Sequence, residues 1–553
     1  MHMFQTVLDV LTKTNDEKIQ IAYRAYAISA DGSTHFFKKD EIVWQKEESL
    51  AHTIEVEFLD LPERKLWTQE VDELAEQPDE SETISPFARY VRRLSTHFEQ
   101  LNDLPNYLIN YARRFVTGDY SQGPISSKSS IYRDTFGFRK LLIFITRNKV
   151  IALDTSNKGQ TVWSRYFGSE GFEFQRIFVV RSSTVKFPPV VVVTGVKRYD
   201  DNGNTLTRLF RLNALTGEDF LPTENASYFP STFDIQGNTR KIFKLPLEEP
   251  EERTHILALI GEGLKARLIF INLMFLFAPF LTIYPNHDSA IRAFRKFASS
   301  FYFALSDGIG SNGLKGYGLV SETDDIKEPF KIENLWTIEF PESEKVVAIG
   351  HRPHHEKVAS LGRVLGDRSV LYKYLNPHLV AVATLSSSTP ATLNIHLIDV
   401  VKGTILFHAV HDSVGASHPV YMIQVENTVV YHFWKDGQSE KGYEVVVYDL
   451  YESENKDERF NTHNFSSFSH ERPYVSAQAF MFPYGVRSIG VTTTKNGIAT
   501  REFLFALNTD QVLGISKRIL DPRRPQRALT NEDKEEMLIP YEPAIPDNKR
   551  FIL

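Results

Sequence analysis

The chain has 553 residues, of which 42% are hydrophobic and 24% are charged, so it carries enough apolar material for large cores. A net charge of −7 and the lack of a long run of Lys or Arg argue against nucleic acid as a partner. The complete absence of cysteine excludes disulfides, thiol catalysis and Cys-ligated zinc. The 40 Phe and 23 Tyr residues favour pleated, half-buried surfaces.

The first 70 residues are predicted to form strands. Ala25–Leu50 combines β-branched and aromatic residues around an Asp-Gly turn, and Val43-Trp44 lies near its end. The first thirty residues contain no continuous apolar stretch of the kind found in a secretory signal. We therefore expect this part of the chain to begin inside a domain.

Residues 71–120 depart from the strand pattern. Val71–Glu82 is acidic and is predicted to be a solvated linker. Ser85-Pro86 suits a helix start, with Ser as the N-cap and Pro at the first helical position. Apolar residues then follow at helical spacing: Phe87, Val91, Leu94, Phe98 and Leu101. This amphipathic helical segment would lie on a membrane surface or brace protein, and its narrow apolar stripe favours the second alternative.

Strand–turn–strand units return from residue 121 onwards. Leu141–Phe167 contains three predicted strands, a tight turn at Arg147–Lys149 and a Trp at position 163. Weaker copies of the pattern follow at Leu209–Phe220, Phe301–Phe340, Ile395–Phe407, Glu444–Leu450 and Phe503–Leu513. Small sheets repeated every 40 residues or more predict an all-β chain of β-propeller blades, with a β-sandwich or β-solenoid as alternatives. The turn written Leu-Asp…Gly…Trp resembles the blade motif of quinoprotein-type propellers.

The most apolar stretch of the chain is Leu268–Tyr284. It lies between two segments that read as the strands of one hairpin, His255–Ile260 and Leu281–Pro285. We interpret residues 263–279 as an apolar insertion into that hairpin. A membrane span is the less favoured alternative, because 17 residues is the lower limit for crossing a bilayer and the flanks are strand-like.

The sequence shows no constellation that carries catalysis. Phosphate-binding and nucleophile motifs do not occur in the structural context they need, and Gly308–Gly313 is better explained as a hairpin loop. Three histidines in His351–Glu356 suggest zinc, but Arg352 and Pro353 favour a solvated loop. We therefore predict no enzyme activity, no cofactor and no metal site.

Two Asn-x-Ser sequons occur, at Asn225 and Asn464. Both lie in turn-like surroundings and are candidate glycosylation sites. They can be glycosylated only if this part of the chain faces the lumen of the secretory pathway.

Three segments in the second half of the chain are more specific in sequence than a strand or turn requires: Gly362–Leu379, Leu520–Pro525 and Leu538–Tyr541. Together they resemble the C-terminal signature of the family that includes the largest subunit of the ER membrane protein complex. The resemblance extends in order over nearly the whole chain, through Val43–Ala51, Phe136–Trp163, Phe301–Leu319, Gly362–Thr384 and Phe503–Tyr541.

The resemblance implies blades from two β-propellers. Residues 1–70 and 121–341 would belong to a membrane-distal propeller, and residues 342–553 to the signature region and a membrane-proximal propeller. It also implies that the chain is a fragment, without the N-terminal part and the C-terminal transmembrane helix of a type I protein of the ER membrane.

The implied function is that of a non-catalytic lumenal scaffold. Its partners would be the other subunits of the complex, and its clients would be multipass and tail-anchored membrane proteins. It would be attached to the ER membrane by the helix missing here. A quinoprotein-like propeller enzyme and a soluble propeller scaffold remain as alternatives.

We expect nine signature residues to help join the propeller to neighbouring subunits: Gly366, Asp367, Arg368, Tyr372, Asn376, Pro377, Asp521, Arg523 and Arg524. The purely structural alternative is that Asp367 caps a turn and pairs with Arg368, while Tyr372 packs as an ordinary strand residue.

Overall fold

A computed structural model describes three stretches of the chain. They are residues 3–63 without 16–17 and 39–40, residues 131–261 without 157, 199–204 and 221–230, and residues 280–552 with short gaps at 307, 309, 321–329, 354–355, 439–440, 461–465, 470, 495–496 and 546–550. The chain divides into two compact units, the first consisting mainly of Met1–Lys244 and the second mainly of Ile269–Leu553.

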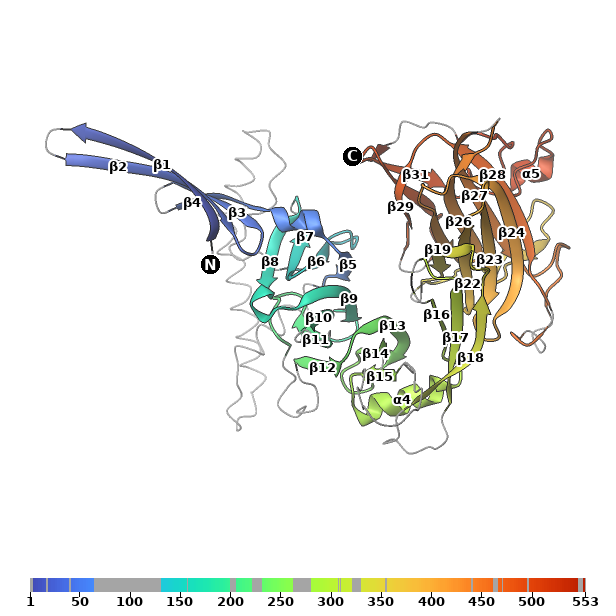
Figure 1. Cartoon of the computed structure of the whole chain (residues 1–553), viewed down its shortest axis with the longest axis horizontal. Coiled ribbons are helices and arrows are strands. Elements are labelled where there is room, and N and C mark those ends of the chain that lie inside the picture. Colours follow the sequence, from blue (N-terminus) through green and yellow to red (C-terminus); the bar gives the residue numbers. More distant parts are fainter. Residues whose placement is uncertain are drawn as a thin grey trace, which may run out of the picture. The chain divides into compact units, whose positions relative to one another are not determined.

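The described part of the first unit is built from four-stranded antiparallel sheets (Figure 1). One sheet contains β1 (Met3–Asn15), β2 (Lys18–Ser29), β3 (Ser33–Lys38) and β4 (Glu41–Glu47). The next contains β5 (Glu55–Asp60), β6 (Lys140–Ile145), β7 (Lys149–Asp154) and β8 (Gln160–Tyr166). The third contains β9 (Glu173–Arg181), β10 (Val190–Arg198), β11 (Thr205–Asn213) and β12 (Thr232–Gln236). Short 3₁₀ helices, η1 (Glu48–His52) and η2 (Gly168–Glu170), follow β4 and β8.

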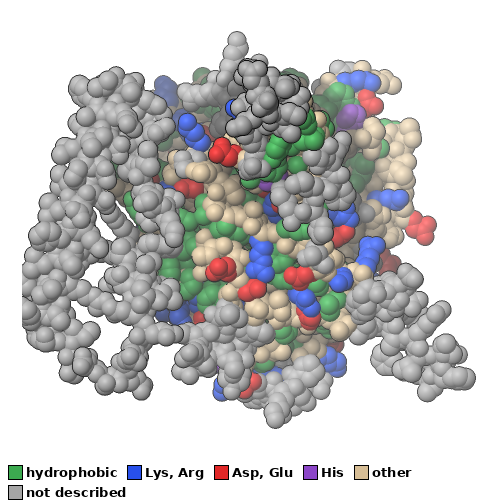
Figure 2. All heavy atoms as spheres, turned by 90° about the vertical axis from the view of Figure 1, so that its left-hand side faces the viewer, with side chains coloured by type: hydrophobic (Ala, Val, Ile, Leu, Met, Phe, Trp, Pro, Cys, Tyr) green, Lys and Arg blue, Asp and Glu red, His purple; other side chains and the backbone are tan. Residues whose placement is uncertain are grey.

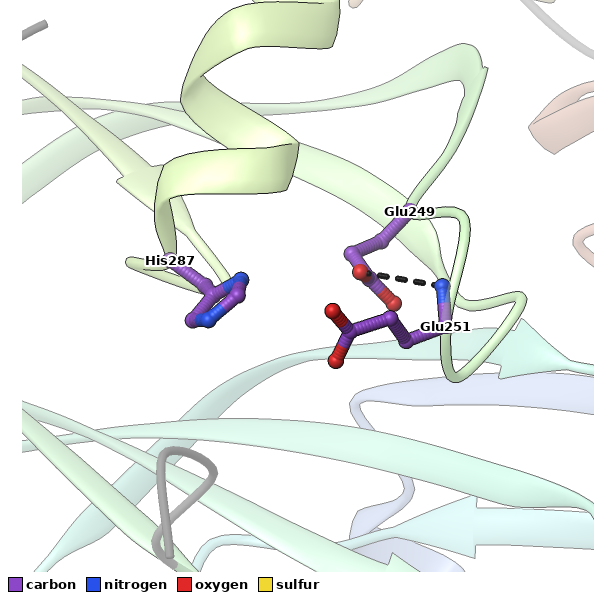
Figure 3. A group of neighbouring side chains, drawn as sticks. All are labelled: Glu249, Glu251 and His287. Atoms are coloured by element: carbon purple, nitrogen blue, oxygen red, sulfur yellow. Dashed lines mark hydrogen bonds between the residues drawn. The ribbon is translucent and has the colours of Figure 1, made fainter. Parts of the chain in front are cut away.

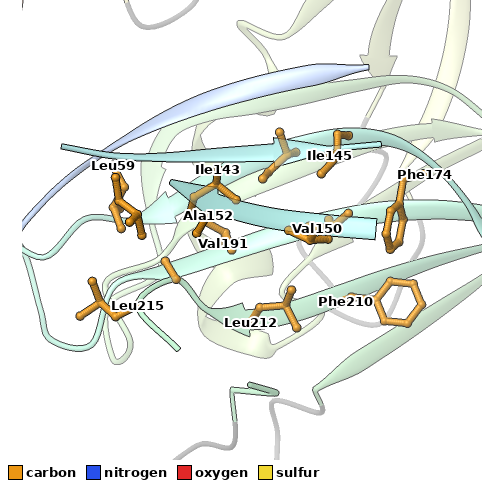
Figure 4. Close-up of a cluster of buried hydrophobic side chains, with 14 of the residues drawn as sticks. Leu59, Ile143, Ile145, Val150, Ala152, Phe174, Val191, Phe210, Leu212 and Leu215 are labelled. Carbon is orange, nitrogen blue, oxygen red and sulfur yellow. The ribbon is translucent and has the colours of Figure 1, made fainter. Parts of the chain in front are cut away.

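Apolar side chains from two of these sheets form the core of the first unit (Figure 4). Ile143 and Ile145 on β6 are fully buried, and Val191 and Val193 on β10 belong to the same cluster. The alternation of inward and outward residues along each strand places these side chains on one face. Phe210 on β11 closes the cluster through edge-to-face contacts with three other phenylalanines.

Around the division between the units, β13 (Thr239–Glu248), β14 (His255–Gly261) and β15 (Phe280–Tyr284) form a three-stranded sheet. The predicted hairpin on either side of the apolar stretch is therefore confirmed, since β14 and β15 are neighbours in this sheet. The insertion itself, 263–279, lies outside the described residues. Among the residues that are described, no helix has both the length and the apolar character needed to cross a bilayer.

The second unit continues the pattern of small antiparallel sheets. Helix α4 (Asp288–Ala298) precedes a sheet of β16 (Tyr302–Ser306), β17 (Gly313–Val320) and β18 (Lys331–Glu339). Then come β19 (Glu344–His351), β22 (Leu379–Ser386), β23 (Ala391–Asp399) and β24 (Thr404–Val414), followed by β25 (Tyr421–Val425), β26 (Thr428–Asp436), β27 (Lys441–Tyr451) and β28 (Tyr474–Phe482). One residue pair, Val414 with Lys435, connects these two groups of four. The last sheet contains β29 (Val486–Val491), β30 (Glu502–Leu507), β31 (Val512–Ser516) and β32 (Phe551–Ile552).

Tryptophans dock on the turns of neighbouring sheets within each unit. In the first unit, the Trp163 indole donates a 3.1 Å hydrogen bond to the carbonyl of Ala214, beside Gly217. In the second unit, the Trp336 indole donates a 2.7 Å bond to the carbonyl of Val400, beside Gly403. Both glycines have a positive φ, and a Cβ at either position would lie 2.4 and 2.5 Å from the tryptophan ring, respectively. In both units, a tryptophan of one sheet therefore packs on a glycine turn of a neighbouring sheet.

The predicted all-β architecture is confirmed by these sheets. The hairpins expected around Arg147–Lys149 and around the glycines at 308–313 are present, as β6–β7 and β16–β17. The amphipathic helical segment and both sequons, Asn225 and Asn464, lie outside the described residues. The division of the blades between a distal and a proximal propeller stays a prediction.

Candidate functional site

The signature residues after Gly362 form a small hairpin in the second unit. β20 (Gly362–Val364) pairs with β21 (Val370–Tyr372), and the Leu365–Ser369 turn joins them. Arg368 adopts a left-handed backbone conformation with φ 69°, and its N–H donates to the carbonyl of Leu365 at 3.0 Å. The hairpin is joined to the end of β27, where the N–H of Glu452 donates to the carbonyl of Tyr372 at 2.8 Å.

Asp367 stabilises this turn from an exposed position. Its carboxylate accepts hydrogen bonds from the backbone N–H and the hydroxyl of Ser369. Its other oxygen lies 2.6 Å from the Lys456 ammonium, and this contact holds the pKa of Asp367 at about 2. The expected capping role is therefore confirmed, but the predicted pairing with Arg368 is wrong. Arg368 has a left-handed backbone conformation in this turn. The cation that pairs with Asp367 is instead Lys456, in the segment after β27.

Gly366 allows a helix to pack directly on the hairpin. A Cβ at this position would lie 2.3 Å from the carbonyl oxygen of Glu532 in α5 (Asn531–Glu535). The N–H of Gly366 donates to the Glu536 carboxylate at 3.2 Å. Any side chain here would push the helix away, so glycine is required for a close approach rather than for a left-handed conformation.

The Leu520–Pro525 segment meets the hairpin through a buried carboxylate. Asp521 is 1% exposed and lies 2.6 Å from the guanidinium of Arg363 on β20. Arg523 lies 3.6 Å from the same carboxylate and 2.8 Å from Glu536. These charges link β20, the Asp521 loop and the end of α5 into one body. We call it the signature module, comprising residues 362–372, 520–525 and 531–536.

Arg524 fixes the path of the chain that follows. Its guanidinium donates to the carbonyls of Ile519, at 2.8 Å, and Pro540. It also lies 5.4 Å from the centre of the Phe480 ring, a cation–π contact. Its side chain is buried, so Arg524 holds the fold together rather than presenting charge to solvent.

Of the remaining predicted residues, Tyr372 ends the hairpin of the signature module, whereas Asn376 and Pro377 lie beyond it in the second unit. Tyr372 is half-buried, with the Arg459 guanidinium 4.6 Å above its ring. Asn376 is buried and donates to Asp399 at 2.6 Å, whereas the neighbouring Pro377 is exposed. Thus Gly366, Asp521 and Arg523 converge in the signature module, and Asn376 belongs to a different polar cluster.

Sequence reasoning missed the partners that complete this module. Arg363 and Glu536 hold its buried charges, and Lys456 neutralises Asp367. It also missed a second network, in which Arg501 bridges Glu356 and Glu426. A single sequence carries no signal for such pairs, because separations such as 13, 89 and 145 residues share no characteristic spacing.

Glu356, the acidic residue of the histidine-containing loop, stabilises the fold. Glu356 lies 3.0 Å from Arg352 and accepts the N–H of Glu426 at 2.9 Å. His354 and His355 lie outside the described residues. Arg352 is therefore an ion-pair partner of Glu356, the one carboxylate in the loop.

Two further polar groups serve as caps in their own units (Figure 3). In the turn after β13, the buried Glu249 carboxylate accepts the N–H groups of Glu251 at 3.1 Å and Glu252 at 2.6 Å. His287 precedes α4, and its imidazole accepts the N–H of Ser289 at 3.3 Å. Each group satisfies backbone donors at a turn or a helix start.

Charges of both signs share the face of the molecule that Figure 2 draws. On the face drawn in Figure 2, Lys and Arg side chains are interspersed with Asp and Glu. Phosphate backbones require clustered positive charge, so this face offers no support for a nucleic-acid interface.

Comparison with known proteins gives one consistent family. Residues 137–553 match the model for the second β-propeller of ER membrane protein complex subunit 1. The chain is 28% identical to ER membrane protein complex subunit 1 of Gallus gallus over 99% of its length, and 26% identical to that of Saccharomyces cerevisiae over 92%. These alignments cover 51% and 61% of the two relatives, so the chain spans little more than half of their length. The chain therefore belongs to the family of ER membrane protein complex subunit 1.

Proposed function

We propose that this chain acts as a non-catalytic scaffold of the ER membrane protein complex, on the lumenal side of the ER membrane. In this role it would hold other subunits in place while they insert and fold multipass and tail-anchored membrane proteins. Membership of the family supports the assignment to the complex. Rigid propeller sheets with exposed loops suit a protein that docks several partners.

The signature module is the observation that carries the scaffold proposal furthest. Its interior is fixed by buried charges, while Asp367 and Arg368 face solvent at the tip of the hairpin. Val364 on β20 is 65% exposed and Met537 after α5 is 61% exposed. A rigid support that presents charged and apolar side chains together is typical of a protein interaction surface.

We therefore assign two roles in subunit contact to five of the nine predicted residues. The exposed Asp367, Arg368 and Pro377 would touch a neighbouring subunit, whereas the buried Asp521 and Arg524 would position the surface that does so. A buried side chain cannot reach a partner, but its loss would move the loops that can.

The test is an affinity purification of the tagged full-length protein from solubilised ER membranes. With the paired change Asp367→Ala and Arg368→Ala, we expect recovery of the other subunits to fall at least several-fold, because two exposed contacts are lost. The melting temperature of the lumenal part should fall by no more than about 4 °C, because losing the Asp367 cap costs about 1 kcal/mol and the Arg368 side chain is exposed.

The matched control is an exposed ion pair elsewhere in the same unit, Arg487 with Asp510. Replacing both residues with Ala should leave recovery and melting temperature unchanged. If the hairpin variant loses stability and partners in parallel, or loses neither, Asp367 and Arg368 do not form a subunit contact.

The lumenal placement has its own test in the two sequons. If residues around Asn225 and Asn464 face the ER lumen, oligosaccharyltransferase can modify them, and endoglycosidase treatment should increase the mobility of the protein from cells. Asn225→Gln and Asn464→Gln would identify which site is used. An unmodified protein at both positions would remove this support for a lumenal location.

A further inference from the structure

A small polar cavity lies beside the end of the signature sequence, within the second unit. Its volume is 170 Å³. It lies between the chain after β21, the end of β23 and residues 466, 467, 469 and 471. The oxygen-bearing side chains in its lining include Asn376, Asp399, Ser466, Ser467, Ser469 and Glu471.

Asp399 gives this cavity a buried negative charge. The residue is 2% exposed, and its carboxylate accepts hydrogen bonds from the Asn376 amide at 2.6 Å, the Ser467 hydroxyl at 2.8 Å and the N–H of Val401 at 2.9 Å. All three donors are neutral. A carboxylate withdrawn from water without a positive partner is destabilising, even when it is hydrogen-bonded.

Asp399 is the exception among the buried aspartates of the described chain. The four others each have an Arg or Lys within ion-pair distance: Asp154 with Arg139, Asp449 with Lys517, Asp521 with Arg363 and Asp533 with Arg527. For Asp399, no Lys or Arg among the described residues lies within 4 Å. The second carboxylate of the cavity, Glu471, is exposed at its rim and likewise makes no ion pair with a described residue.

We propose that this cavity binds a divalent cation of the Ca²⁺ type. The bound charge would compensate Asp399 and Glu471, and the serine hydroxyls would supply further oxygen ligands. The Asn376 Oδ1 already accepts the N–H of His378 at 2.8 Å, which leaves it one lone pair. Ca²⁺ takes six to eight oxygen ligands in a flexible arrangement, and carboxylates, amides and water all serve. The 170 Å³ volume leaves room for several waters, each of which occupies about 30 Å³.

The hydrogen bonds to Asp399 fit a ligand of this kind. Asn376 and Ser467 both donate to Oδ2, whereas Oδ1 accepts from the Val401 N–H alone, so Oδ1 retains a lone pair. Carboxylates that bind metals are commonly oriented by such neighbouring donors. This inference rests on the geometry of the second unit and is independent of the scaffold proposal.

The test measures Ca²⁺ binding to the purified 553-residue chain by isothermal titration and by thermal unfolding. We expect CaCl₂ to raise the melting temperature relative to EDTA, and MgCl₂ at the same concentration to have a much smaller effect, because Mg²⁺ demands a tighter octahedral site. Glu471→Gln should weaken Ca²⁺ binding at least tenfold without changing the melting temperature in EDTA, because Glu471 is exposed.

Asp399→Asn should abolish binding, and Glu454→Gln, an exposed change in the same unit, should retain it. The variant Glu471→Gln keeps the test decisive if Asp399→Asn fails to fold. No Ca²⁺ response in the unmodified chain, an equal response to Mg²⁺, or full retention of binding in Glu471→Gln would each overturn the proposal.

Discussion

The core of the first unit and the signature module of the second unit are held together by different forces. In the first, Phe210 meets Phe167, Phe172 and Phe174 with ring centres 5.0 to 5.8 Å apart, and aliphatic residues from two sheets surround them. In the second, a fully buried carboxylate, Asp521, lies between two arginines. One region is maintained by apolar burial, and the other by paired charges.

The difference determines how each region responds to change. Apolar burial is non-directional, so a core loses stability roughly in proportion to the volume removed. A buried ion pair depends on its partner, because the group left behind remains charged in a poorly solvated place. We therefore expect graded losses in the first region and abrupt losses in the second.

The largest expected effect is the loss of the central charge of the signature module. Asp521→Ala leaves Arg363 and Arg523 without the carboxylate between them, and should lower the free energy of unfolding by about 3–5 kcal/mol. Removing one methylene from the apolar core, as in Ile143→Val, should cost only about 0.5–1.5 kcal/mol. Urea unfolding followed by circular dichroism measures both.

Two further variants show whether the charge is responsible. Asp510→Ala removes an exposed partner of Arg487 and should cost no more than about 1 kcal/mol. Adding Arg363→Met to Asp521→Ala should recover part of the loss, since one uncompensated cation disappears. If Asp521→Ala costs no more than Asp510→Ala, the contrast between the two regions is wrong.

The second expected effect concerns the packing of a tryptophan ring on a glycine turn, which occurs in both units. Gly217 and Gly403 combine a positive φ with a tryptophan ring less than 3 Å from any added Cβ, whereas Gly159 has a positive φ and open space. An alanine at Gly159 should cost about 1–2 kcal/mol from backbone strain alone. Gly217→Ala and Gly403→Ala should cost about 1–3 kcal/mol more, because the ring must move. Thermal unfolding of the three variants gives the comparison, and equal losses would mean that docking of the tryptophan adds nothing.

The sequence predicted the apolar half of this comparison much better than the charged half. The strands around Leu141–Phe167 were predictable because alternation and turn residues act over a few positions, and the resulting core follows from them. The docking of Trp336 on the Asp399–Gly403 turn did not follow from the sequence, because Trp336 and Val400 lie 64 residues apart.

The charged half depends on proximity that only the folded chain creates. Gly366, Asp367 and Asp521 stood out because the family resemblance contains them, and the sequence left open whether they are structural or exposed. Only the fold shows that Asp521 is buried against Arg363 while Asp367 faces solvent and pairs with Lys456. Asp399 was not predicted as a site residue for the same reason, because its lack of a Lys or Arg partner among the described residues depends on the folded structure.

A further expected effect is a pH response of opposite sign in the two units. Burial raises the pKa of Glu57 on β5 to about 7, and lowers the pKa of His396 and His432, on β23 and β26, to about 4. Between pH 4.5 and 7 the folded first unit binds the Glu57 proton that the unfolded chain releases, so this group makes the unit more stable as pH falls. Between pH 6.5 and 4 the unfolded chain protonates histidines that the folded second unit keeps neutral, so these groups make that unit less stable as pH falls.

Each group contributes a slope of at most about 1.4 kcal/mol per pH unit, because one proton is involved. Urea unfolding at pH values from 7.5 to 4.5 should therefore change in opposite ways in two variants. Glu57→Gln removes the gain at low pH and should steepen the overall loss of stability, whereas His432→Gln removes part of the loss and should flatten it. Slopes that match the unmodified chain in both variants would mean that neither side chain is desolvated as its burial indicates, and that the two units respond to pH alike.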